Sequence, residues 1–294
     1  MFESSGYFRR VAEICVRINE FTDPGCPWAY SAEPFRRRLN WLYEGGLEWV
    51  PRMVVLADTA EDYASRGYTA ERVAESHRRF VHEHGMPIDT RVRPRVAGTR
   101  AACLAVVAAR ENASELETRR LLRALRVRHF SGEMLDEQAT IDGATNDAGL
   151  SPDELRSWCA SSEVEDRLAD DMGAAREPLP PARVLDHKLA NWSGGRRYTC
   201  PSYEITRLDD DVTISVPGFQ PFASYEVVLA NLVPGVHRHA PPSSVEEVLR
   251  WADMPLASQE VAVICDLDLL TAREELSRVA HETHVGAEGF WMLI

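Results

Sequence analysis

The sequence lacks any apolar run long enough to cross a bilayer, and residues 1–15 lack the charged, apolar and small-residue regions of a secretory signal. Positive charge is also in deficit, because the formal net charge is −13 at pH 7. This balance argues against a protein that generally wraps nucleic acid or sits on an anionic membrane. We therefore expect a cytoplasmic globular protein without a membrane partner.

A disulfide framework is also lacking, because the six cysteines are scattered without a regular spacing. Such a distribution is typical of reduced thiols in a cytosolic protein. Four of the cysteines are expected to be small buried hydrophobic residues. These four are Cys15, Cys103, Cys159 and Cys265. The other two, Cys26 and Cys200, lie in segments whose sequences indicate a reactive site.

Cys26 lies in the segment from Asp23 to Ala29, which reads Asp-Pro-Gly-Cys-Pro-Trp-Ala. Alternating apolar residues predict a strand over 15–21 before it, and helical spacing predicts a helix over 32–39 after it. A thiol at the start of a helix lies near unpaired N–H groups and the positive end of the helix dipole, which lower its pKa. Cys26 is therefore a candidate nucleophile, with Pro27 and Trp28 shaping its site.

This segment resembles the active-site segment of thioredoxin-like proteins, and within them the DsbA family with its FrnE-like and mycothiol-dependent reductase branches. Those relatives read Asp-Pro-x-Cys-Pro-Trp-Cys, whereas this chain has Ala29 in place of the second cysteine. The resemblance covers roughly residues 14–232. It implies a thioredoxin-like α/β fold with a large inserted helical domain.

The order of predicted strands and helices divides the chain into three units. Strand, helix and strand in the first 58 residues predict a parallel pair, and more than a hundred residues of helical periodicity follow it. The expected units are a thioredoxin-like domain at 14–58 and 183–232, a helical insertion at 59–182, and a C-terminal domain at 240–294. Three predicted helices and a β wing make the last unit resemble a winged helix.

Pro201 is the expected cis-proline of the thioredoxin-like fold. Two strands around a turn at 209–210 are followed by Gly218-Phe219-Gln220-Pro221, which resembles the start of the family's last helix. Counting back across this hairpin places Pro201 at the cis-proline position, with Pro217 as the competing candidate. The backbone of Cys200 is then expected to face Cys26 and to pair with substrate.

Without a cysteine at position 29, three outcomes remain open for Cys26. A low-molecular-weight thiol such as mycothiol or glutathione resolves the mixed disulfide, or Cys200 resolves it, or Cys26 binds without reacting. Arg196 and Arg197 are candidates to meet an anionic thiol cofactor, with a solvated charge pair as the alternative. No tightly bound cofactor is expected.

Other charged clusters are expected to be solvated. Histidines at 82, 84, 237 and 239 have no accompanying acid or cysteine cluster at ligand spacing, so we expect no metal site. Arg36, Arg37 and Arg38 are expected on the exposed side of their helix. Residues 240–294 contain ten acidic and three basic residues, a net charge of −7, which favours a docking or dimerisation module over a DNA reader.

The favoured function is a cytoplasmic DsbA/FrnE-like thiol oxidoreductase that acts through one cysteine, with a small-molecule thiol or disulfide as substrate. One alternative is a thiol-dependent isomerase or transferase of the 2-hydroxychromene-2-carboxylate isomerase or kappa glutathione transferase type. The other is a non-catalytic thioredoxin-like adaptor or regulator. A protein partner at the C-terminal domain and a homodimer are further expectations, whereas DNA is not expected as a partner.

Overall fold

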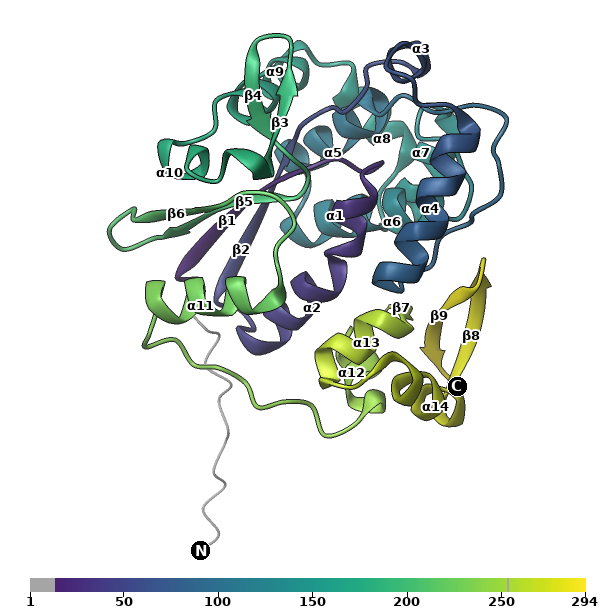
Figure 1. Cartoon of the computed structure of the whole chain (residues 1–294), viewed down its shortest axis with the longest axis vertical. Coiled ribbons are helices and arrows are strands. Elements are labelled where there is room, and N and C mark those ends of the chain that lie inside the picture. Colours follow the sequence, from purple (N-terminus) through teal and green to yellow (C-terminus); the bar gives the residue numbers. More distant parts are fainter. Residues whose placement is uncertain (1–13, 253) are drawn as a thin grey trace, which may run out of the picture.

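The computed structural model describes residues 14–252 and 254–294 of the chain. Its central sheet consists of β1 (Val16–Thr22), β2 (Leu47–Met53), β5 (Ser202–Arg207) and β6 (Thr213–Val216). The strand order is β2-β1-β5-β6 (Figure 1). β1 pairs in parallel with β2, and β5 pairs antiparallel with both β1 and β6. The predicted parallel pair and the predicted later strand pair are therefore confirmed.

One face of this sheet is covered by helices that follow its strands. α1 (Pro27–Ser31) and α2 (Glu33–Leu42) connect β1 to β2, and α11 (Phe222–Leu232) follows β6. Ile18 on β1 belongs to the same buried apolar cluster as Leu39 of α2 and Leu229 of α11. Alternation along β1 places such residues on this face, so burial of apolar area holds both helices against the sheet.

The opposite face of the sheet packs against the helical segment between β2 and β5. α5 (Arg100–Asn112) and α9 (Ser162–Arg176) both contact β2, and Met53 shares a buried cluster with them. The other helices of this segment are α3 (Ala60–Ser65), α4 (Ala70–His84), α6 (Glu115–Phe130), α7 (Gln138–Asp147), α8 (Pro152–Cys159) and α10 (Pro180–Arg183). The predicted helical character of this long segment is confirmed.

Two details of this segment differ from the prediction. The single helix expected over 151–169 is two helices, because the Ser161 side chain accepts a hydrogen bond from the backbone N–H of Glu163 and starts α9. The turn expected over 143–149 is helical as far as Asp147, since Ile141 and Ala144 are buried on one face of α7. Burial of that face outweighs the local turn signal of the glycine.

The chain returns to the sheet through a hairpin that the sequence analysis missed. A short 3₁₀ turn (Asp186–Lys188) precedes β3 (Leu189–Trp192), which pairs antiparallel with β4 (Gly195–Tyr198). The single strand predicted over 197–205 is therefore divided into β4 and β5. The division falls at Pro201, which has no N–H group to donate to a strand partner.

The C-terminal unit combines three helices with a three-stranded sheet of order β7-β9-β8 (Figure 1). Trp41 of α2 lies edge-on to Trp251, with ring centroids 5.3 Å apart, so the unit shares a core with the central sheet's helices. Its elements are α12 (Val245–Ala252), β7 (Leu256–Ala257), α13 (Ser258–Cys265), α14 (Leu269–Val279), β8 (Ala280–Val285) and β9 (Glu288–Leu293).

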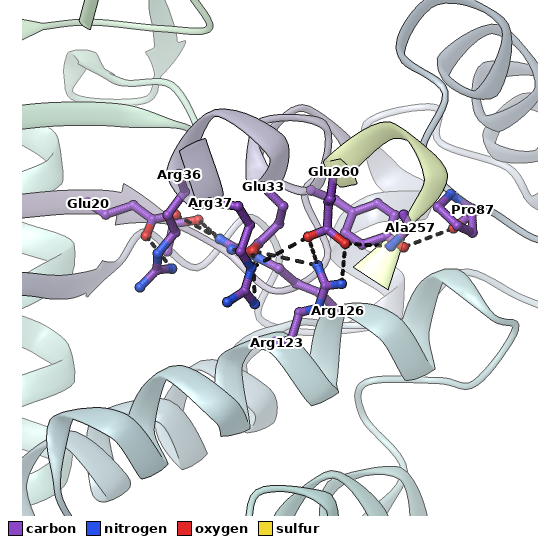
Figure 2. A network of polar contacts seen from close by, with 11 residues as sticks. Glu20, Glu33, Arg36, Arg37, Pro87, Arg123, Arg126, Ala257 and Glu260 are labelled. Atoms are coloured by element: carbon purple, nitrogen blue, oxygen red, sulfur yellow. Dashed lines mark hydrogen bonds and ion pairs between the residues drawn. The ribbon is translucent and has the colours of Figure 1, made fainter. Parts of the chain in front are cut away.

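A network of buried charges, shown in Figure 2, joins these parts of the molecule. Arg126 of α6 donates to Glu20 of β1 at 2.9 Å and also to Glu33 of α2. Arg123 of α6 forms a bidentate pair with Glu260 of α13, with both N–O distances 2.6 Å. We call the following residues the buried ion network: Glu20, Glu33, Arg36, Arg37, Arg123, Arg126 and Glu260.

The expectation that residues 36–38 decorate a solvated helix face is wrong for two of the three. Arg36 and Arg37 are buried, and Arg36 donates to Glu20 at 3.0 Å. Burial alone would raise the pKa of Glu33, but the charges of Arg126 and Arg123 hold that pKa far below its ordinary value.

Within residues 14–252 and 254–294, none of the helices combines the length and apolar character needed to cross a membrane.

Candidate active site

Cys26 occupies the N-cap position of α1, where β1 passes into the helix. Its backbone is extended, with φ −83° and ψ 115°, and Pro27 follows in the first helical turn. The backbone N–H of Cys26 donates to the carbonyl oxygen of Asp23 at 3.1 Å. The predicted location of the cysteine, between a strand and the start of a helix, is confirmed.

Asp23 is a structural residue of this loop whose role the sequence analysis did not identify. Its side chain is fully buried and accepts hydrogen bonds from the Gly25 N–H (2.8 Å), the Leu56 N–H (2.8 Å) and the Thr99 hydroxyl (2.7 Å). These three donors come from the Cys26 loop, the segment that follows β2 and the residue that precedes α5. Asp23 therefore fixes the Cys26 loop to the helical segment, because a buried carboxylate holds its donors firmly.

The Cys200–Pro201 peptide bond is the cis bond of the described chain, as predicted, and the alternative at Pro217 is wrong. The thiol of Cys26 donates to the carbonyl oxygen of Cys200 across 3.3 Å. Both sulfurs are free thiols. The structure thus brings together Cys26, Cys200 and Pro201, which lie far apart in the sequence.

The two thiols differ in acidity. Burial would raise the pKa of Cys26, but hydrogen bonds from the Cys200 side chain and from backbone N–H groups of α1 lower that pKa below its ordinary value. For Cys200, burial and the adjacent Cys26 sulfur raise the pKa well above its ordinary value. Cys26 is therefore the thiol of the pair that ionises first, and only the thiolate is a strong nucleophile.

Trp28 forms the exposed edge of the site, whereas Cys26 is only 5% exposed. The indole of Trp28, 39% exposed, lies edge-on to Phe80 with ring centroids 4.9 Å apart, and 5.3 Å from the rings of both His84 and Phe219. His84 is thus part of an aromatic cluster rather than a solvated surface, and burial lowers its pKa. The expectation for His84 was wrong because its partners come from α1 and from the loop before α11.

Arg196 and Arg197, the two arginines expected to meet a thiol cofactor, have different contacts in the structure. Arg196 forms an ion pair with Asp186 at 2.8 Å and also donates to the carbonyl oxygen of Leu189. Its guanidinium group is therefore already occupied. Arg197 donates to the carbonyl oxygen of Tyr198 at 2.7 Å, and its positive charge acts to lower the pKa of Cys200. Of the two, Arg197 lies near the thiols.

A cavity of about 350 Å³ adjoins the loop that carries Cys26. Gly25 and Pro27 form one side of it, and the other lining residues come from α3, α4, the turn between these helices, the segment 91–99 and His129 of α6. Tyr63 lines this cavity, and its pKa is raised well above the ordinary value, first by burial and then by the negative charges of Asp23 and Cys26. Tyr63 gave no signal in the sequence because only the folded chain brings it to the site.

No grouping of three or more histidine, cysteine, aspartate or glutamate side chains in the described part of the chain is arranged to hold a metal ion.

The four remaining cysteines differ in how deeply they are buried. Cys103 is buried in the core as expected, whereas Cys15, Cys159 and Cys265 are only half-buried. Burial still raises the pKa of each of these four thiols, which makes them poor nucleophiles.

Two solved structures are similar to this chain in fold. No protein-family model and no curated protein matches the chain. A probable DsbA oxidoreductase from Streptomyces coelicolor matches it with a TM-score of 0.55 at 20% identity, over 78% of this chain and 93% of that structure. The cytosolic disulfide reductase DsbM from Pseudomonas aeruginosa matches with a TM-score of 0.50 at 16% identity, over 73% of this chain and 99% of that structure. The fold is thioredoxin-like.

These thioredoxin-like neighbours confirm the predicted α/β fold class. In this chain the central sheet, with β1 and β2 parallel and with β5 and β6 antiparallel, is accompanied by many helices. Identities of 16–20% establish a shared fold, and one fold hosts many activities.

Proposed function

We propose that the protein is a cytoplasmic, DsbA/FrnE-like thiol oxidoreductase that acts through Cys26 alone, with mycothiol or glutathione as co-substrate. The observation that carries the proposal is the 3.3 Å contact between the Cys26 sulfur and the Cys200 carbonyl oxygen, together with the lowered pKa of Cys26. Pro27 and Trp28 shape the thiolate site, and Pro201 positions the backbone of the substrate. The contact places the Cys26 sulfur beside the cis-proline segment, and a thiol of lowered pKa at such a place is a site for thiol-disulfide exchange.

The reaction is a pair of exchange steps. The Cys26 thiolate attacks one sulfur of a disulfide, a mixed disulfide forms at Cys26, and the other sulfur leaves as a thiolate that takes a proton. The thiolate of mycothiol or glutathione then attacks the substrate sulfur of the mixed disulfide, which regenerates the Cys26 thiolate. One disulfide is consumed and one is formed, so the electrons balance.

Two observations favour an external thiol over Cys200 in the second step. Burial raises the pKa of Cys200 well above its ordinary value, so little of it is thiolate near neutral pH. Ala29, which is buried, stands where the motif's second cysteine would be. The 5% exposure of Cys26 also favours a small thiol or disulfide over a bulky protein substrate.

A second candidate function is a thiol-dependent isomerase or transferase that acts on a small molecule. The cavity of about 350 Å³ beside Gly25 and Pro27 favours it, because pockets of this size are typical of small-molecule sites. A non-catalytic adaptor is the third. It differs from both enzymes in requiring no reaction at Cys26.

For the domains, we propose the thioredoxin-like domain at 14–58 and 183–232, the helical insertion at 59–182 and a winged-helix-like domain at 240–294. The order helix, strand, helix, helix, strand, strand in the last unit supports the winged-helix assignment. We propose that this acidic unit docks a protein partner or a second copy of the chain rather than DNA.

The test is an exchange assay between bis(2-hydroxyethyl) disulfide and either glutathione or mycothiol. We expect Cys26→Ser to abolish turnover and Cys200→Ser to retain it, with an adduct of the small thiol on Cys26 seen by mass spectrometry. Cys159→Ser is the matched control, since Cys159 lies on α8, and it should behave like the wild type. Turnover that survives in Cys26→Ser would overturn the proposal, and absence of turnover in the wild type would favour the adaptor.

A further inference from the structure

We infer that the cavity beside the Cys26 loop, called here the arginine cavity, binds a small molecule carrying a carboxylate or phosphate group. Its lining includes five arginines and, within the part of the chain that the structure describes, no acidic residue. The arginines are Arg66, Arg72, Arg91, Arg93 and Arg95. The inference rests on the proposed function only in taking the bound molecule as one that Cys26 acts upon.

The positive charge of the arginine cavity is only partly compensated by the protein. Arg91 pairs with Asp89 at 2.7 Å, and Arg95 pairs with Asp136 at 2.6 Å. The other three arginines have no carboxylate within 4.0 Å among the described residues. The negative charge of Asp89 still acts on Arg93, without a direct ion pair. Guanidinium groups without a direct carboxylate partner in a concave site attract anions, which matters in a chain whose net charge is −13.

The three unpaired guanidinium groups are held in place by neutral groups. Arg66 donates to the carbonyl oxygen of Leu56 at 2.7 Å, and its guanidinium lies 5.2 Å from the centre of the Tyr63 ring. Arg72 donates to the carbonyl oxygen of Gly67 at 3.0 Å. These contacts orient the cations without neutralising them, so their charge remains available to a ligand.

Arg93 is held by His129 of α6. It donates to the carbonyl oxygen of His129 at 2.5 Å and lies 3.2 Å from the ring nitrogen Nδ1 of the same histidine. Its Nε is buried and has no hydrogen-bond partner. A buried N–H group without a partner is costly, and Arg93 is one of the residues that line the cavity.

Two buried histidines line the same cavity and stay neutral. Burial and the charge of Arg93 lower the pKa of His77 to about 4, and the same causes lower the pKa of His129 well below its ordinary value. The cations facing the cavity are therefore arginines at every pH near neutrality. Neutral imidazoles supply hydrogen-bonding groups beside them without changing the charge.

The lining also limits the chemistry of the ligand. Guanidinium groups bind carboxylates and phosphates in a bidentate manner. Tyr63, Tyr68, Val73 and Val96 supply aromatic and apolar walls. At about 350 Å³ the cavity lies at the small end of ligand pockets. The ligand class is thus a small organic acid or phosphate ester with an apolar or aromatic body.

The test uses isothermal titration of the Cys26→Ser protein with phenyl phosphate, phthalate and the neutral compound benzamide. We expect saturable binding of at least one anion, with benzamide at least ~10-fold weaker, the factor that one charge-assisted contact supplies. Phenyl phosphate and phthalate distinguish the phosphate from the carboxylate. Saturable binding of neither anion, or equal binding of benzamide, would overturn the inference.

Variants locate the site of binding. Arg72→Gln and Arg93→Gln are each expected to weaken the anion ~10-fold, and Arg72 is exposed enough for its variant to fold. Arg78→Gln is the matched control, because Arg78 is exposed on the same helix and does not line the cavity. Equal loss in the Arg72 and Arg78 variants would contradict the assignment. The Cys26→Ser protein cannot perform exchange, so failure of the exchange assay leaves this result unaffected.

Discussion

The sulfur of Cys26 lies 3.3 Å from the carbonyl oxygen of Cys200, a residue 174 positions later in the chain. This contact brings the start of α1 against the segment that enters β5. It also places two free thiols side by side with opposite shifts in pKa. The proposed chemistry follows from this pairing, because one thiol is activated and the other is kept protonated.

The Cys200 side chain contributes to that activation through a hydrogen bond to Cys26. We expect Cys200→Ala to raise the pKa of Cys26 and to slow its reaction with iodoacetamide several-fold at pH 7. Cys200→Ser, whose hydroxyl still donates, should retain most of the rate. Equal rates in the two variants would show that the hydrogen bond does not lower the pKa.

The buried ion network is expected to be essential for stability. Replacing Arg126 by methionine removes a buried guanidinium that Glu20 and Glu33 share, and leaves one carboxylate oxygen of each without this donor. We expect a loss of about 3–5 kcal/mol in the free energy of unfolding, measured by urea denaturation. Arg250→Gln breaks the exposed pair with Glu246 and should cost no more than about 0.5 kcal/mol. A similar cost for both variants would contradict the importance of burial.

His77 makes the stability depend on pH. Its folded-state pKa of about 4 lies below the ordinary value of 6.5, so its contribution is complete above pH 6.5 and is lost as the pH falls toward 4. The expected loss is roughly 3 kcal/mol over that interval. His77→Gln should flatten the curve relative to the wild type, whereas His82→Gln, at an exposed position, should not. Parallel curves for all three proteins would contradict this role.

The tip of the C-terminal hairpin rests against the helical segment. Gly286 has φ +64°, and a Cβ atom there would lie 2.5 Å from the carbonyl oxygen of Ile88. We expect Gly286→Ala to lower the free energy of unfolding by about 1–3 kcal/mol. Gly235→Ala, with open space around it, is the control and should be nearly neutral. An unchanged unfolding midpoint for Gly286→Ala would argue against this contact.

Local patterns predicted the parts of the site that a short segment encodes. Alternation over 15–21 fixed β1, and the motif around Cys26 together with the hairpin before Gly218 placed Pro201 correctly. The β3–β4 hairpin was missed because its strands have only four residues each, too few for a periodic signal.

The predictions that were wrong or missing concern residues whose contacts are distant in the sequence. Arg37 was expected in solvent because three consecutive arginines are normally solvated, but its partner Glu260 lies in the C-terminal unit. The arginine cavity was missed for the same reason, since its cations come from the residue after α3, from α4 and from the segment 91–95. Only the folded chain shows that these residues meet.

The most direct test of the account is the pH dependence of Cys26 alkylation by iodoacetamide, followed peptide by peptide with mass spectrometry. The account predicts an apparent pKa for Cys26 below the ordinary value of about 8.5, with Cys200 unmodified over the same pH range. An apparent pKa for Cys26 at or above that value, or earlier modification of Cys200, would contradict the claim that Cys26 is the activated nucleophile.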